Sequence, residues 1–235
     1  LYDHVITISE AIRQVLLDEG LAADKVSCVR SAVDPTPFLA PVDPSAFRAE
    51  FRLPQDALVI GMVAQMIPRK GHRYLFSALP GLVERYPELQ VLVFGQGPLL
   101  GELRGDVAAR GLDSVVHFTG FRHDLASWIG GLDMLAHPAE MEGLGVSLLQ
   151  AAAAGVPVIT SRAGGLPEAV QDGVTGILCP PGDVDALAAA IDRLAGDPAL
   201  RRQYGEAGRQ RILAEFSIDR MVDGNLALYH QVLGR

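Results

Sequence analysis

Short apolar runs alternate with amphipathic stretches along most of this chain. The amphipathic stretches have helical spacing over about 72–85, 98–110, 124–130, 145–154, 166–171 and 184–195, and the apolar runs around them are Leu58–Val63, Val91–Phe94, Val115–Phe118, Met134–His137, Val158–Thr160 and Gly176–Cys179. Runs that are apolar on both faces are typical of strands buried in a parallel sheet. With right-handed crossovers, the alternation predicts an α/β fold with a Rossmann-like, doubly wound parallel sheet.

The two ends of the chain depart from this alternation. Val5–Ser9 and Val26–Arg30 are expected strands on either side of a helix from Glu10 to about Glu19. The proline-rich stretch 34–44 follows, and because proline removes amide donors and disfavours a preceding helix, we interpret it as a connector. Two more expected helices, about 198–215 and 218–233, complete the chain.

Composition and charge narrow the class of protein. With 49% hydrophobic and 20% charged residues the chain is an ordinary globular one, and its net charge of −8 argues against nucleic acid or an anionic membrane as a general partner. Its two cysteines, Cys28 and Cys179, lie in expected strands, and the histidines lack ligand spacing, so we expect core thiols and no metal site.

Targeting and membrane segments are not indicated either. No apolar run approaches the ~18 residues that span a bilayer, and no signal peptide is supported. The chain starts at Leu1 directly before a strand-like run, so we expect a piece of a longer protein or a mature product.

A basic turn follows the first strand of the main domain. Residues 64–72 lead into a helix and include the adjacent cations Arg69 and Lys70. Cations in the first turn of a helix oppose its dipole, whereas an anion held by free amides is favoured there. A phosphate bound between Lys70 and those amides explains the placement; a solvated loop with exposed basic residues is the alternative.

Two glycine turns follow the next two strands. Gly95-Gln96-Gly97-Pro98 lacks the three-glycine dinucleotide fingerprint, so a tight turn is the favoured interpretation. Gly120-Phe121-Arg122 is equally unspecific by itself. Because ligands of open parallel sheets bind beyond the carboxyl ends of the strands, all of these loops are nevertheless candidates for chemistry.

The most informative stretch is 137–151, where a strand ends and a helix begins. Gly143 and Gly145 allow a ligand to approach the backbone closely and leave amides free at the helix start. Glu142 stands directly before them, either as a helix cap or as an acceptor for sugar hydroxyls, with the amides left for a phosphate. Gln150 follows about two helical turns later, so both side chains are expected to line one cleft.

A second glycine pair, Gly164-Gly165, follows the fifth strand and precedes Leu166-Pro167-Glu168 at the start of a helix. It is either a close-approach loop for a ligand or only a tight connection, and the residues favour neither. Asp172-Gly173 is a turn signal to which no chemistry is assigned.

Together these motifs resemble the retaining glycosyltransferases of the GT-B fold that are called glycosyl transferases group 1. The likeness covers nearly the whole chain and rests on Val5-Ile6-Thr7-Ile8-Ser9-Glu10, Ser31-Ala32-Val33-Asp34, Pro68-Arg69-Lys70-Gly71, Glu142-Gly143-Leu144-Gly145, Gly164-Gly165-Leu166-Pro167-Glu168 and the stretch 172–183. It implies that residues 1–40 are a remnant of an N-terminal acceptor domain with its linker. Residues 41–216 would then be the nucleotide-sugar donor-binding domain, and residues 217–235 a helix that crosses back to the N-terminal domain.

The resemblance also implies roles for individual residues. Lys70 would neutralise the donor diphosphate and Glu142 would hold hydroxyls of the donor sugar, which makes these two the expected catalytic residues. The expected donor-binding residues are Gln65, Arg69, Gly120, Phe121, Gly143, Leu144, Gly145, Gln150, Gly164 and Gly165. The reaction would retain the anomeric configuration by electrostatic stabilisation of the leaving diphosphate, with no metal or other cofactor, because the nucleotide sugar is itself a substrate.

The partners implied are a UDP- or GDP-sugar, an acceptor glycan, lipid or small molecule, and the missing N-terminal domain in cis. The fragment alone is therefore expected to be inactive. The expected location is the cytoplasm, and peripheral attachment of the full-length protein at the inner face of the membrane is compatible with it.

Three departures from the family pattern matter. The usual arginine five positions before the lysine is Gln65, which removes a cation from the phosphate site. The motif's second glutamate is Gln150, a neutral acceptor that binds ribose hydroxyls more weakly than a carboxylate does. Most of the acceptor domain is absent. Gln65 and Gln150 motivate an alternative, a nucleotide-sugar-binding module without turnover, whereas a related GT-B epimerase or phosphorylase fits the two glycine motifs less well.

Overall fold

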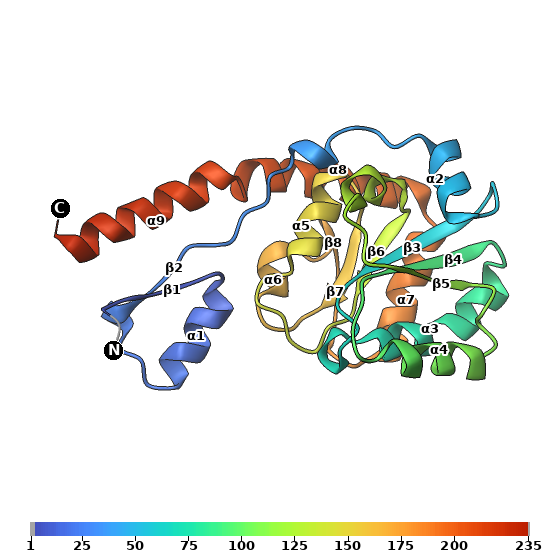
Figure 1. The fold of residues 1–235 in the computed structure, drawn as a ribbon, viewed down its shortest axis with the longest axis horizontal. Coiled ribbons are helices and arrows are strands. Elements are labelled where there is room, and N and C mark those ends of the chain that lie inside the picture. Colours follow the sequence, from blue (N-terminus) through green and yellow to red (C-terminus); the bar gives the residue numbers. More distant parts are fainter. Residues whose placement is uncertain (1–2, 235) are drawn as a thin grey trace.

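The computed structural model describes residues 3–234 and contains a six-stranded parallel sheet (Figure 1). Its strands are β3 (Leu58–Val63), β4 (Leu89–Phe94), β5 (Val116–Gly120), β6 (Met134–His137), β7 (Val158–Ser161) and β8 (Gly176–Cys179). They lie in the order β5-β4-β3-β6-β7-β8, so the chain runs outward from β3 to one edge and then from β6 to the other. This strand order is that of a doubly wound Rossmann-like domain, which confirms the predicted fold class.

Helices cover both faces of this sheet. One face carries α3 (His72–Arg85), α4 (Leu100–Ala109) and α7 (Val184–Ala195), and the other carries α2 (Pro44–Phe51), α5 (Val146–Ala153), α6 (Leu166–Ala169) and α8 (Pro198–Glu215). Successive residues of β3 alternate between the two layers, with Val59 in one core and Ile60 in the other. The sheet therefore has the two-sided core that continuous apolar runs predict.

A helix that was not predicted begins at the end of the proline-rich stretch, so the interpretation of Asp43 and Pro44 as part of the connector is wrong. α2 begins directly after Asp43, whose carboxylate accepts a hydrogen bond from the Ser45 amide at 2.8 Å, and Pro44 occupies the first turn, where no amide is needed. Phe47 is fully buried and packs edge-on against Phe51, with ring centroids 5.2 Å apart. The proline starts a helix here, and apolar packing holds it against the sheet.

The helix predicted over 124–130 is also wrong, because the structure has two 3-10 turns there, Leu125–Ser127 and Ile129–Gly131. Glycine lowers helix propensity by about 1 kcal/mol relative to alanine, and two glycines lie at 130 and 131. A Cβ at Gly131 would stand 2.5 Å from the Phe47 ring, so glycine is needed for packing. The remaining 3-10 turns of the described residues are Ala23–Lys25, Thr36–Phe38 and Pro68–Lys70.

A small separate unit precedes the main domain. β1 (Val5–Thr7) and β2 (Val26–Cys28) form a two-stranded parallel sheet beside α1 (Glu10–Asp18). The Ser9 hydroxyl accepts a hydrogen bond from the Ile12 amide at 3.2 Å, so Ser9 caps α1. We refer to residues 5–30, which contain β1, α1 and β2, as the N-terminal unit.

The final helix joins this unit to the main domain. α9 (Ile218–Leu233) leaves the main domain after α8 and runs alongside the N-terminal unit, as Figure 1 shows. A Cβ at Gly224 of α9 would lie 3.1 Å from the Val29 side chain, so glycine permits this close packing. The predicted boundaries near 40 and 216 fall between elements; the roles given to the three parts stay predictions, and residues 1, 2 and 235 lie outside the described structure.

Burial separates the two cysteines. Cys179 in β8 is buried as predicted. Cys28 at the end of β2 is only half-buried, so its prediction as a core residue is wrong. The sheet around Cys28 has only two strands, and an open cavity between it and α9 leaves the side chain partly exposed.

Candidate functional site

The crevice of an open α/β sheet lies where the strand order reverses, which here is between β3 and β6. The loops 64–71 and 138–145 follow these two strands and touch each other. The Glu140 amide donates to the Arg69 carbonyl at 2.8 Å. Gly71 has a φ of 75°, and a Cβ there would stand 1.9 Å from the Pro138 carbonyl oxygen, so this approach requires glycine.

Lys70 and Glu142 meet in this crevice. The Lys70 ammonium donates to Glu142 Oε2 and forms an ion pair with it, and only 11% and 16% of the two side chains are exposed. Glu142 Oε2 also lies 3.3 Å from His137 Nε2, while Glu142 Oε1 accepts from the Gly143 amide at 3.2 Å. The structure thus brings the two expected catalytic residues together, and their catalytic roles stay predictions.

The charges around Glu142 keep it ionised. Burial alone raises the pKa of Glu142, but hydrogen bonds from His137 and Lys70, with the charge of Lys70, outweigh burial and lower the pKa to about 2. Burial lowers the pKa of the His137 imidazole, and the Glu142 carboxylate offsets that effect only in part. At neutral pH the Glu142 side chain is therefore a carboxylate and the His137 imidazole is neutral.

Two histidines border the pair and were not predicted as site residues. His137 ends β6, is 1% exposed, and accepts a hydrogen bond from the Thr160 hydroxyl through its carbonyl at 2.7 Å. His72 opens α3. Burial, together with repulsion from Lys70 and from His137 in its protonated form, lowers the pKa of His72 to about 4. Within residues 3–234, Nδ1 of His137 and both ring nitrogens of His72 lack hydrogen-bond partners. The sequence signal that could have marked both histidines as site residues is their position next to the two loops, His72 directly after 64–71 and His137 directly before 138–145.

The start of α5 supplies backbone donors beside Glu142. Gly145 is the N-cap residue, and its φ of 84° favours glycine. Among the described residues, no acceptor pairs with the amides of Gly145, Val146 or Ser147, as is usual for the first turn of a helix. The Leu144 side chain is buried in the core, so only its backbone is available to a ligand.

Gly164 and Gly165 bring a third loop against the first two. The Gly165 amide donates to the Glu142 carbonyl at 3.0 Å. A Cβ at Gly164 would stand 2.2 Å from the Glu142 carbonyl oxygen, and one at Gly165 would stand 1.9 Å from that of Gly143. Backbone packing therefore explains both glycines; their contact with a donor stays a prediction.

A cavity of about 280 Å³ opens beyond the ends of β3, β4 and β5. It is lined by Val63, Ala64, Gln65, Phe94, Gly95, Gln96, Phe121, Arg122 and Leu125. Phe121 is 58% exposed at its edge, and Gly120 ends β5 with a φ of 76°. Arg122 is anchored by Glu50 at 2.8 Å and Asp124 at 2.6 Å. The predicted donor residues Gln65 and Phe121 thus share one cavity.

Two predicted site residues are less closely tied to this arrangement. Gln150 lies in the second turn of α5 and is half-buried, and no hydrogen bond of its side chain occurs within residues 3–234. Arg69 is exposed and contributes its carbonyl to the contact between the two loops. The cleft shared by Gln150 and Glu142 stays a prediction.

Comparison with known proteins identifies the arrangement. Residues 44–211 match the family model described as "Glycosyl transferases group 1". The chain belongs to this family. It is 33% identical over 236 residues to the 2-deoxystreptamine glucosyltransferase of Streptomyces kanamyceticus, covering 98% of this chain and 61% of that enzyme. It is 36% identical over 199 residues to the D-inositol 3-phosphate glycosyltransferase of Kribbella flavida, covering 80% of this chain and 47% of that enzyme.

Solved structures with the same architecture include two that cover nearly all of this chain. Anabaena HepE in complex with UDP and glucose gives a TM-score of 0.92 at 24% identity, over 98% of this chain and 64% of that chain. Sucrose-phosphate synthase from Thermosynechococcus elongatus gives a TM-score of 0.87 at 30% identity, over 100% of this chain and 59% of that chain. The predicted GT-B resemblance is confirmed, and the chain spans less than two thirds of each of these proteins. Among the described helices, none is both long and apolar enough to cross a membrane.

Proposed function

We propose that this chain is the donor-binding half of a glycosyltransferase that moves a sugar from a nucleotide sugar to an acceptor, with retention of configuration and without a metal. The Lys70–Glu142 pair at the switch point carries this proposal, because it places a cation and a carboxylate beside free helix amides. The glucosyltransferase of Streptomyces kanamyceticus and the UDP complex of Anabaena HepE support a nucleotide-sugar donor.

Lys70 changes partners when the donor binds. In the free chain the Glu142 carboxylate holds its ammonium, and the donor diphosphate competes for it. The first-turn amides of α5 bind the same diphosphate from the other loop. Negative charge builds on the leaving diphosphate in the transition state, so donors already aimed at it accelerate the reaction. Gln65 adds only a neutral hydrogen bond here.

Glu142 becomes available to the sugar when Lys70 leaves it. His137 and the Gly143 amide still hold the carboxylate, so it keeps its place. The free lone pairs then accept hydrogen bonds from sugar hydroxyls. The negative charge also favours the positive charge that develops at the anomeric carbon of a glycosyl-transfer transition state.

The cavity beside the loop of Lys70 is the subsite proposed for the nucleotide base. Its walls are mostly apolar, with the amides of Gln65 and Gln96 at its rim and Phe121 as a stacking surface. A UDP- or GDP-sugar is the donor class proposed, with Gln150 on the ribose and Gly120 beside the base. Gly164 and Gly165 support the Glu142 loop from behind.

The acceptor half lies outside this chain. We propose that an N-terminal domain in cis binds a glycan, lipid or small-molecule acceptor and that residues 3–234 alone do not transfer sugar. The full-length enzyme would act in the cytoplasm, at the inner face of the membrane where the acceptor is a lipid.

Calorimetry with UDP, GDP, ADP, UDP-glucose and GDP-mannose tests the proposal. At least one nucleotide should bind, and Lys70→Ala should weaken it by ~1.5–3 kcal/mol, the contribution of a hydrogen bond to a charged group. Lys25→Ala, which alters an exposed lysine of the N-terminal unit, is the control and should bind as the wild type does. Failure of every nucleotide to bind the wild type would exclude a donor site.

The neutral residues Gln65 and Gln150 favour a second candidate, a binding module without turnover. Assay of the full-length protein with the bound nucleotide sugar and a broad acceptor panel separates the two. Product formation supports the transferase, and persistent binding without product supports the module.

A further inference from the structure

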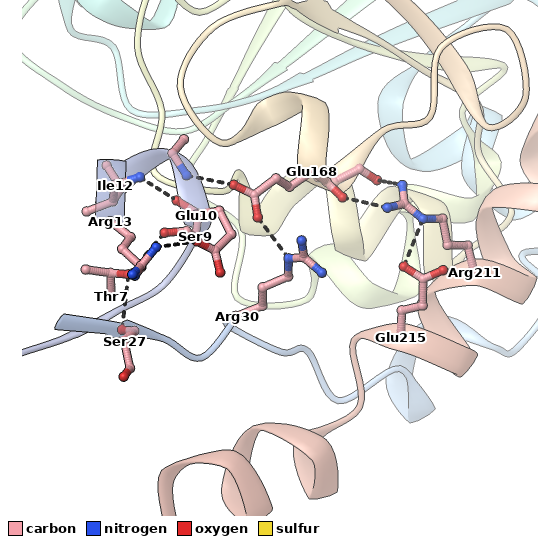
Figure 2. A network of polar contacts seen from close by, with 12 residues as sticks. Thr7, Ser9, Glu10, Ile12, Arg13, Ser27, Arg30, Glu168, Arg211 and Glu215 are labelled. Carbon is pink, nitrogen blue, oxygen red and sulfur yellow. Dashed lines mark hydrogen bonds and ion pairs between the residues drawn. The ribbon is translucent and has the colours of Figure 1, made fainter. Parts of the chain in front are cut away.

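Glu168 ends the glycine-rich motif 164–168, and its carboxylate reaches across to the N-terminal unit (Figure 2). Its Oε1 accepts a hydrogen bond from the Ala11 amide at 2.9 Å, and its Oε2 accepts one from Arg30 Nε at 2.8 Å. The donor site as proposed leaves this glutamate without a role. Both of its partners belong to a part of the chain that is more than a hundred residues away in sequence.

The contact with Ala11 satisfies the start of α1. The first amides of a helix have no partner within the helix, and the Ser9 hydroxyl accepts a hydrogen bond from one of them, the Ile12 amide. Glu168 supplies an acceptor for a further amide, and its negative charge lies where the helix dipole favours it. Burial raises the pKa of Glu168, but hydrogen bonds from Arg30 and the α1 backbone outweigh burial and hold the pKa below its usual range. The group is therefore charged at neutral pH.

The backbone around Glu168 is itself fixed to the main domain. Arg211 of α8 donates to the Glu168 carbonyl at 2.8 Å and to the Ala169 carbonyl at 3.2 Å. Glu215 lies on the far side of Arg211, with its carboxylate 3.2 Å from Arg211 Nε, as Figure 2 shows. α6 is thus held from behind by α8 while its glutamate holds α1.

The N-terminal unit also touches the loop that carries Glu142. A Cβ at Gly143 would stand 2.8 Å from Ile8 Cδ1, and one at Gly165 would stand 3.0 Å from Ser9 Cβ. The Gly165 amide is in turn bound to the Glu142 carbonyl. Placement of the N-terminal unit therefore restricts the backbone of the Glu142 loop.

We propose that Glu168 is a positioning residue that fixes the N-terminal unit against the Glu142–Gly143 loop, so that this loop keeps its shape only while the unit is held. The role of that loop in donor binding rests on the proposed function, whereas the attachment itself does not. An isolated ion pair on the protein surface contributes little to stability. Here the carboxylate side chain is only 15% exposed and serves two donors, one of them a helix amide.

Hydrogen exchange of the free chain tests the attachment directly, because local opening sets the exchange of helix amides. In Glu168→Gln we expect exchange in α1 to rise roughly tenfold, the factor for losing a hydrogen bond to a charged group, together with faster exchange over 141–147. Glu215→Gln is the matched control. It removes the carboxylate that pairs with Arg211, and within residues 3–234 that carboxylate has no hydrogen bond or ion pair to the N-terminal unit, so α1 should exchange as in the wild type.

Arg30→Gln provides a second test that does not depend on how Glu168→Gln folds. It removes one of the two contacts of the Glu168 carboxylate and leaves the contact with Ala11. Because the Arg30 side chain is 46% exposed, we expect a smaller rise, roughly threefold, in the exchange of α1. Unchanged exchange of α1 in both variants would overturn the attachment. Faster exchange of α1 with an unchanged 141–147 segment would overturn its effect on the loop.

Adding UDP-glucose or GDP-mannose in the same experiment separates this inference from the proposed function. Bound donor should slow exchange over 141–147 in the wild type and slow it less in Glu168→Gln. If neither nucleotide sugar alters exchange in the wild type, the proposed function fails while the comparison of free chains still decides the role of Glu168.

Discussion

Neutralising Glu142 should tighten the binding of a nucleoside diphosphate. In the free chain the Glu142 carboxylate holds the Lys70 ammonium, so a diphosphate must compete for it. Glu142→Gln keeps the size of the side chain and removes the competing charge. Two unit charges ~6 Å apart interact by ~3 kcal/mol at an effective dielectric constant of about 20. Because solvent and Lys70 screen most of this repulsion, we expect a net gain of ~1 kcal/mol, a roughly fivefold lower Kd.

Removing the cation should have the opposite effect. Lys70→Ala deletes the charged hydrogen bond to the diphosphate and leaves the Glu142 carboxylate to repel it, so affinity falls by ~1.5–3 kcal/mol. In the Lys70→Ala background, Glu142→Gln should tighten binding by more than it does in the wild type, since the carboxylate there is no longer neutralised. The two effects are therefore not additive, as expected for residues in contact.

Titration calorimetry with UDP on the wild type, the two single variants and the double variant measures this cycle. Lys25→Ala controls for the loss of an exposed lysine that is not among the expected site residues. If Glu142→Gln weakens UDP binding as much as Lys70→Ala does, the ion pair only supports the two loops, and Lys70 does not move from Glu142 to the diphosphate. An unchanged Kd in Lys70→Ala would remove Lys70 from the site.

Three further predictions concern stability and the ribose. In urea unfolding, Gly165→Ala should destabilise the fold by ~1–3 kcal/mol, because its Cβ would meet the Gly143 carbonyl oxygen at 1.9 Å. The control Gly105→Ala lies at an open position of a helix and should stabilise the fold by ~0.5–1 kcal/mol. The pKa of Glu142 is lowered from 4.5 to about 2. The Glu142 carboxylate therefore stabilises the fold above pH ~4.5, and this contribution is lost as the pH falls toward ~2. The difference in unfolding free energy between wild type and Glu142→Gln should change over that pH range. Gln150→Glu should remain folded and bind UDP at least as tightly, and unfolding of this variant would show that the side chain supports the core.

The central strands of the main domain were predictable because they contain continuous apolar runs that both helix layers bury, whereas in the edge strand β5 only Val116 is buried. α2 was not, since Asp43 and Pro44 were interpreted as loop residues although together they form a helix start. What holds α2 is the packing of Phe47 in the core, a contact with distant residues that the local sequence does not contain. Phe47 also affects the segment that was predicted as a helix over 124–130. Gly131 packs against the Phe47 ring, and the segment forms two 3-10 turns.

The meeting of Lys70 and Glu142 was predictable from topology, because carboxyl ends of parallel strands share one edge and family motifs marked both loops. The involvement of His137 was not, since a histidine at the end of an apolar strand is indistinguishable from a core residue by pattern alone. The contacts of Glu168 were equally hidden, because its partners Ala11 and Arg30 come from the other end of the chain. Only the folded structure brings such residues together.

The central claim is that the β3/β6 crevice binds the diphosphate of a nucleotide sugar. A crystal structure of this chain with UDP tests it most directly. We predict the diphosphate about 2.7–3.1 Å from Lys70 Nζ and from first-turn amides of α5, the base in the cavity beside Gln65 and Phe121, and the Lys70–Glu142 ion pair opened. A nucleotide bound elsewhere, or bound with that ion pair intact and its phosphates in solvent, would contradict the account.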